Sequence, residues 1–65
     1  MVVKVIELVG SSPYNWTDAV NNAVREVSKT SDDIIGVEIS NFTANTNEGN
    51  ISEYKANVQI SFRVH

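Results

Sequence analysis

The segment spanning residues 54–64 alternates apolar and polar residues without interruption, and this pattern constrains the fold more than any other. The apolar positions are Tyr54, Ala56, Val58, Ile60, Phe62 and Val64, and the polar positions are Lys55, Asn57, Gln59, Ser61 and Arg63. Successive side chains of a β-strand point to opposite faces of a sheet, so this strand has one face for a core and one polar face. Amide and hydroxyl groups dominate the polar face, which suits contact with another subunit or with a ligand.

The length of 65 residues corresponds to one domain, residues 1–65, which needs support from outside its own core. A domain of this size buries only about 60% of the surface that its unfolded chain exposes. The sequence has no cysteine, which excludes disulfides and thiolate metal sites, and its single histidine, His65, cannot form a structural zinc site alone. We therefore expect the chain to form a homo-oligomer.

Charge and hydropathy exclude two classes of partner. The net charge is −3 and the five basic residues are dispersed, whereas nucleic-acid binding favours clustered Lys and Arg. No apolar stretch approaches the roughly 20 residues of a membrane span, and the first residues do not form a signal peptide. The sequence predicts a cytoplasmic protein with no nucleic-acid or membrane partner.

Hydrophobic periodicity predicts four elements. The helix is expected to follow the N-cap Asn15, with Asp18 placed to stabilise its first turn and Lys29 in its last turn, and to end at Ser31-Asp32-Asp33. Its apolar stripe consists of Trp16, Ala19, Val20, Ala23, Val24 and Val27. The predicted strands are residues 2–9, residues 34–46 and the segment after a turn at residues 47–50.

This order of elements predicts an α+β fold of β-α-β-β type. The last two strands form a hairpin and are therefore antiparallel, and a helical crossover between neighbouring strands would make them parallel. A wholly antiparallel three-stranded sheet consequently has the order 1-3-2, with the helix on one face. Strict alternation in the second strand places Gly36, Glu38 and Phe42 on the open face together with Val3 and Val5. An open face with these apolar residues requires a partner.

The chain resembles the dodecins, a family of small flavin-binding proteins of about this length. The resemblance rests on Lys4–Ser12 leading into a helix that an aromatic residue, Trp16, opens. It also rests on Asp32-Asp33-Ile34-Ile35 and on the spacing of Tyr54, Val58, Ile60 and Phe62. It implies a three-stranded antiparallel sheet wrapped around one helix, a hollow homododecamer, and flavins stacked in pairs between subunits.

Two positions depart from the flavin-binding members of this family. A tryptophan that stacks on the flavin ring and a glutamine that binds the ring's polar edge correspond to Gly36 and Lys55. Binding of riboflavin, FMN or FAD in the family's usual mode should therefore be weakened. Phe42 offers a displaced stacking platform or an inter-subunit contact, and Lys55 either meets an anionic ligand or pairs with a carboxylate such as Glu38.

The resulting prediction is a non-enzymatic, dodecin-like shell that binds, stores or buffers a small aromatic cofactor. The candidate ligand-binding residues are Gly36, Lys55, Glu38 and Phe42, and no residues are assigned to catalysis because no nucleophile and base are paired. The alternative is a shell that has lost flavin binding and is purely structural or binds calcium through unassigned carboxylates. An interaction module whose open face docks onto another protein is a third alternative.

Overall fold

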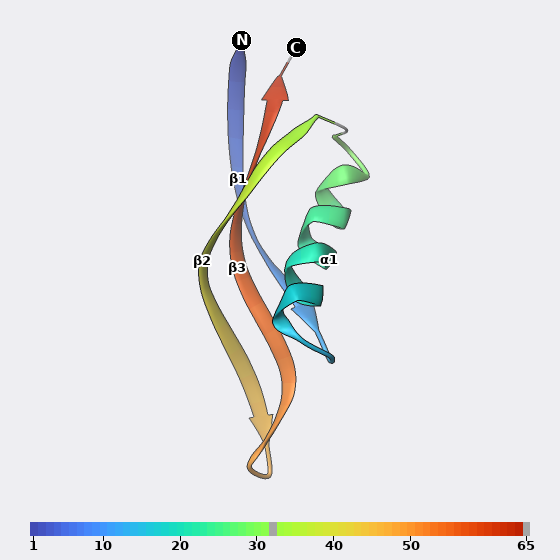
Figure 1. Cartoon of the computed structure of the whole chain (residues 1–65), viewed down its shortest axis with the longest axis vertical. Helices are drawn as coiled ribbons and strands as arrows, with labels where there is room; N and C mark the ends of the chain where they lie inside the picture. The colour runs from blue at the N-terminus through green and yellow to red at the C-terminus, as the bar shows by residue number, and fades with distance from the viewer. Residues whose placement is uncertain (32, 65) are drawn as a thin grey trace.

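The four predicted elements occur in the predicted order (Figure 1). The computed structural model describes residues 1–31 and 33–64, so the expectations that involve Asp32 and His65 lie outside the described residues. The elements are β1 (Val2–Ser12), α1 (Trp16–Ser28), β2 (Ile34–Asn47) and β3 (Asn50–Val64).

The sheet has the order β1-β3-β2, and both pairings are antiparallel. The α+β fold with the predicted order 1-3-2 is thus confirmed, and the strictly alternating segment is the central strand. The β2–β3 connection is a two-residue loop, in which Glu48 has φ 52° and Gly49 has φ 81°. Positive φ at both loop positions matches the right-handed twist of the two strands.

The start of the helix follows the prediction closely. Asn15 has extended backbone angles, and its side-chain oxygen accepts a hydrogen bond from the Asp18 backbone N–H at 2.7 Å. The buried Ser12 hydroxyl donates to Asp18 Oδ2 at 2.7 Å and accepts from the Tyr14 backbone N–H at 2.9 Å. The Asn15 contact satisfies a backbone donor that the first turn of a helix cannot pair internally, and the Ser12 contacts fix the segment that leads into that turn.

The first strand extends to Ser12, past its predicted end at Val9, because Gly10 packs against the helix while it remains paired with Ala56. A Cβ atom on Gly10 would lie 2.1 Å from the Ala19 carbonyl oxygen and 2.9 Å from the Ala23 Cβ. Because Gly10 has no side chain, the helix can approach the sheet closely at this point. The buried core is correspondingly small and consists of Ala19, Ala23, Val27, Ala56, Val58 and Ile60.

The second strand is irregular, and this irregularity corrects one prediction. Its register with β3 shifts between Ile34 and Gly36, between Ile39 and Asn41, and between Asn45 and Thr46. An extra residue at a β-bulge reverses the faces of the residues that follow it. Phe42 therefore pairs with Ala56 on the helix side, and the prediction that it lies on the open face is wrong.

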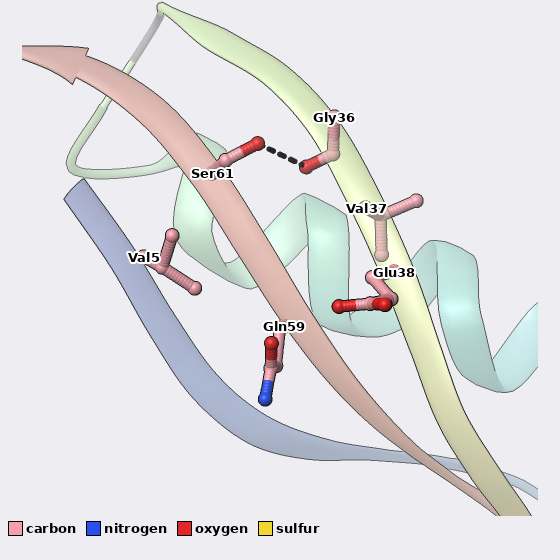
Figure 2. Close-up of a pocket in the computed structure, with 6 residues that line it drawn as sticks. All are labelled: Val5, Gly36, Val37, Glu38, Gln59 and Ser61. Atoms are coloured by element: carbon pink, nitrogen blue, oxygen red, sulfur yellow. Dashed lines mark hydrogen bonds between the residues drawn. The ribbon is translucent and has the colours of Figure 1, made fainter. Parts of the chain in front are cut away.

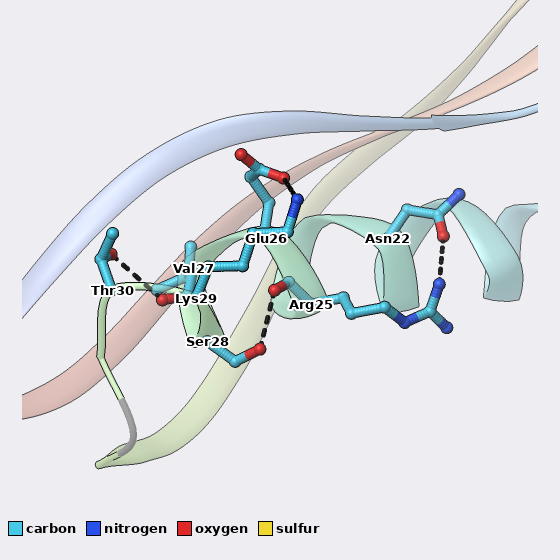
Figure 3. Close-up of polar contacts among 7 residues, drawn as sticks. All are labelled: Asn22, Arg25, Glu26, Val27, Ser28, Lys29 and Thr30. Atoms are coloured by element: carbon cyan, nitrogen blue, oxygen red, sulfur yellow. Dashed lines mark hydrogen bonds and ion pairs between the residues drawn. The ribbon is translucent and has the colours of Figure 1, made fainter.

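The outward face of the helix is occupied by local polar contacts (Figure 3). Arg25 Nη1 donates to Asn22 Oδ1 at 2.8 Å, and Lys29 Nζ lies 2.9 Å from Glu26 Oε2. The Thr30 hydroxyl donates to the carbonyl three residues earlier at 3.3 Å, beyond the last helical turn. In these contacts each polar group is paired with a partner three residues away, which is typical of a solvent-facing helix surface.

The subunit is elongated, with extents of 49 × 19 × 13 Å. The helix lies along only part of the sheet, and the β2–β3 hairpin extends beyond its N-terminal end (Figure 1). The chain exposes 4483 Å², whereas a compact monomer of this size exposes about 4,100 Å². The excess surface fits a subunit that buries more of its area in an assembly.

Candidate functional site

The sheet face turned away from α1, here called the outer face, is uncovered in the single chain. The polar positions of β3 lie on it, as the alternation predicts, and valines of β1 flank them. The register places Val9 beside Asn57, Val5 beside Ser61 and Val3 beside Arg63. Val5 and Val9 are each 57% exposed. The outer face therefore combines a polar centre with an exposed apolar edge.

The outer face is hollowed beside Gly36 (Figure 2). The hollow, here called the Gly36 hollow, has a volume of about 250 Å³. A Cβ atom on Gly36 would lie 3.3 Å from the Ser61 hydroxyl oxygen, and no other described atom outside the adjacent residues would lie within 4 Å of it. The Ser61 hydroxyl donates to the Gly36 carbonyl at 3.4 Å. The residues that line the hollow are Val5, Gly36, Val37, Glu38, Gln59 and Ser61.

Glu38 and Gln59 supply the main polar groups of the hollow. The register pairs both Glu38 of β2 and Glu7 of β1 with Gln59, so two carboxylates flank one amide in a single row across the sheet. Figure 2 shows the Glu38 carboxylate reaching toward β3, next to the Gln59 side chain. Within residues 1–31 and 33–64, no ion pair or side-chain hydrogen bond engages these three side chains. Their hydrogen-bonding capacity is available to a ligand.

Lys55 lies on the outer face but does not line the hollow. It is paired with Ser11 of β1 and Thr43 of β2. Its Nζ lies 3.8 Å from Glu53 Oε1, so its carboxylate partner within the chain is Glu53 and not Glu38. An exposed ion pair of this length contributes about 0–1 kcal/mol to stability. The position of Lys55 is as predicted, and its contact with a ligand stays a prediction.

Phe42 belongs to an aromatic cluster on the helix side. Its ring centroid lies 5.8 Å from that of Trp16, and Tyr54 meets Trp16 edge-on at 4.8 Å. The Trp16 indole N–H donates to the Thr43 carbonyl at 2.9 Å, which confirms the predicted role of Trp16 in helix–sheet packing. Phe42 remains 49% exposed. A ligand contact through Phe42 would thus need a site on the helix side of the sheet.

Metal binding by one subunit finds little support in its geometry. Among residues 1–31 and 33–64, no three His, Cys, Asp or Glu side chains gather where they could hold one ion. A calcium site built on the outer face would have to combine carboxylates from different copies of the chain. Within the same described residues, no helix has the length and apolar character that crossing a membrane requires.

Sequence reasoning identified Gly36 and Glu38 but did not single out Val5, Gln59 and Ser61 as neighbours of that position. The missing information was the register of three strands, because these residues meet only when β1 and β2 are both aligned on β3. Once the strand order was predicted, the alternation of β3 already placed Gln59 and Ser61 on the correct face. Counting residues from the hairpin turn could have given the approximate pairing of β2 with β3.

The fold and the hollow together define a class of protein: a small α+β subunit with one helix on one face of a three-stranded sheet and a hollow on the other, uncovered face. The dodecin family model matches residues 2–65, and the chain therefore belongs to the dodecin family.

Solved dodecin structures support this assignment. The dodecin of Streptomyces coelicolor is 26% identical with a TM-score of 0.94, over 98% of this chain and 91% of that chain. A tryptophan-to-phenylalanine variant of the Thermus thermophilus dodecin is 26% identical with a TM-score of 0.94, over 98% and 96%. A calcium-chelating dodecin of Mycobacterium tuberculosis is 29% identical with a TM-score of 0.88, over 100% and 93%. The search of curated proteins gave no match.

Proposed function

We propose that this chain forms a cytoplasmic homododecamer that binds, stores or buffers a small flat aromatic ligand between subunits, without catalysing a reaction. Riboflavin, FMN or FAD is the default ligand by family resemblance. The observation that carries the proposal is the Gly36 hollow, which opens on an otherwise uncovered sheet face. The proposed ligand contacts are Gly36 and Glu38 at the hollow. Lys55 lies beside the hollow, and a contact through Phe42 would need a separate site on the helix side.

Association is supported by the surface that one subunit leaves exposed. Val3, Val5 and Val9 of β1 face away from the helix, and burial of such side chains contributes roughly 25 cal/mol per Å². The core contains no aromatic side chain and is dominated by alanine and β-branched residues. Contact between copies would bury the outer face and supply the stabilisation that the small core lacks.

Ligand affinity for a flavin should be modest. Gly36 offers no aromatic plane, and an aromatic stack contributes about 0.5–1.5 kcal/mol beyond area burial. The hollow instead offers Val5 for apolar contact and the Gln59 amide for hydrogen bonds. We expect riboflavin to bind more weakly than it would to a pocket with a stacking tryptophan.

The proposal is tested by the mass of the assembly and by a fluorescence titration of riboflavin with ligand-free protein. A dodecameric mass with saturable quenching of flavin emission, at about one flavin per two or fewer subunits, is the expected result. A dodecamer that gives no quenching at tens of micromolar would remove flavin as the ligand. A monomeric mass at micromolar concentration would contradict the shell and favour a module that docks onto another protein.

A calcium-stabilised shell is the second candidate. The two carboxylates that flank Gln59 favour it, as does the similarity to a calcium-chelating dodecin. Oxygen ligands from several copies could complete the six to eight that calcium takes. This alternative predicts that chelation with EDTA lowers the melting temperature of the assembly and that added calcium restores it. Unchanged melting after chelation would leave a shell without a structural ion.

A further inference from the structure

The charge of the Gly36 hollow limits which ligand it can hold. Glu38 lines the hollow, and Glu7 lies in the same row across the sheet. The neighbouring rows, centred on Ser61 and Asn57, contain no charged residue among their paired positions. The paired residues around the hollow therefore carry negative charge alone.

The basic residues of the outer face, Lys55 and Arg63, do not line the hollow. Each is four residues from Gln59, which corresponds to about 13 Å between backbone positions along a strand. The ammonium group of Lys55 lies near Glu53, on the side of Lys55 away from the hollow.

Hydrogen-bonding groups in the hollow accept more than they donate. The Glu38 carboxylate only accepts, and the Ser61 hydroxyl already donates to the Gly36 carbonyl and can accept through its remaining lone pairs. The Gln59 amide offers both a donor and an acceptor. A ligand rich in N–H donors matches this set, whereas a phosphate or carboxylate would face an unpaired carboxylate.

The shape of the hollow adds a second requirement. Gly36 leaves a flat stretch of backbone, and Val5 supplies an apolar wall across β3 from it (Figure 2). We propose that the ligand of the Gly36 hollow is a flat organic cation that lies over Gly36 and Val5 and donates hydrogen bonds to Glu38. This inference rests on the proposed function, because contact between subunits would exclude water and strengthen the pairing of the two charges.

Three dyes with tricyclic rings of similar size and with different charge test the inference: proflavine, a cation; riboflavin, which is neutral; and FMN, an anion. Each is titrated into the intact assembly at low and at physiological salt, and fluorescence is followed. The expected order of affinity is proflavine, riboflavin, FMN. Glu38→Gln should weaken proflavine about tenfold and weaken riboflavin much less, because it removes the charge and retains the size and a hydrogen-bonding group.

Glu48→Gln is the matched control, since it removes the same charge at the hairpin tip, outside the hollow. Equal weakening of proflavine by both substitutions would show attraction to the net negative charge, and would overturn the inference. Saturable riboflavin binding with no preference for proflavine would also overturn it and leave the proposed function standing. Failure of all three dyes to bind a dodecamer of the expected mass would contradict both.

Discussion

Gly10 and Gly36 lie on opposite faces of the same sheet, and the missing side chain has an opposite consequence at each. At Gly10 the space is filled by the helix, whose Ala19 carbonyl would be 2.1 Å from an added Cβ. At Gly36 the space stays open, and the nearest atom to an added Cβ is the Ser61 hydroxyl oxygen at 3.3 Å. The helix side of the sheet is therefore close-packed around Gly10, whereas the outer face is hollowed at Gly36.

The largest effect is expected from Gly10→Ala. The added methyl group would collide with backbone of α1, and a close-packed interior relieves such a collision only by moving the helix. We expect a loss of roughly 3 kcal/mol in the free energy of unfolding. Urea denaturation followed by Trp16 fluorescence, at a fixed subunit concentration, measures it.

Gly36→Ala is the matched substitution on the other face, and its cost should stay below about 1 kcal/mol because a serine hydroxyl can rotate away. Equal losses for the two alanine variants would refute the contrast between a filled and an open glycine position.

Ser12→Ala should have the next largest effect. Ser12 is buried on the helix side, where its hydroxyl links Asp18 to the backbone N–H groups that precede the helix. Its removal leaves these donors without their side-chain acceptor and takes one hydrogen bond from the carboxylate, which keeps its contact with Asn22; the loss costs about 1–3 kcal/mol. The urea midpoint is again the measurement, with Ser11→Ala as the control, since Ser11 is exposed on the outer face. An equal and small effect of both variants would contradict the assigned role of Ser12.

The start of the helix and the hairpin turn were predictable from sequence because their signals are local. The N-cap at Asn15 and the turn at Glu48-Gly49 each depend on a few adjacent residues. The strand order followed from the chain connections together with the assumption of a wholly antiparallel sheet. The bulge before Phe42 was not predictable, because alternation does not reveal which residue of a strand is extra.

The outer-face site was predictable only in part, for a physical reason. Gly36 and Glu38 are close in sequence, so their shared face near the start of β2 could be inferred. Val5 and Ser61 are distant from them in the chain and meet them only through pairing with a third strand. A hollow formed by an absent side chain also leaves no sequence signal of its own, since glycine equally marks a turn, a bulge or a close contact.

Gly36→Trp sharpens the contrast by giving the open position the aromatic plane that the family resemblance associates with flavin stacking. We expect riboflavin affinity to rise about tenfold, as one additional stacked ring would contribute, while the mass of the assembly stays unchanged. Gly36→Ala serves as the control without a ring. Loss of assembly in Gly36→Trp, with assembly retained in Gly36→Ala, would mean that a neighbouring subunit occupies the space above Gly36.

The smallest effect is expected from Lys55→Ala, on the outer face but outside the hollow. The Lys55 ammonium is partly exposed and 3.8 Å from Glu53, so its removal should change stability by less than about 1 kcal/mol. Comparison of riboflavin with FMN tests its contact with a ligand, because the two differ by one phosphate. Affinities for both should change by less than twofold if the ligand stays in the Gly36 hollow. A selective loss of FMN affinity in Lys55→Ala would instead extend the ligand site along β3 to Lys55 and give that site a positive end, which the paired residues around the hollow lack.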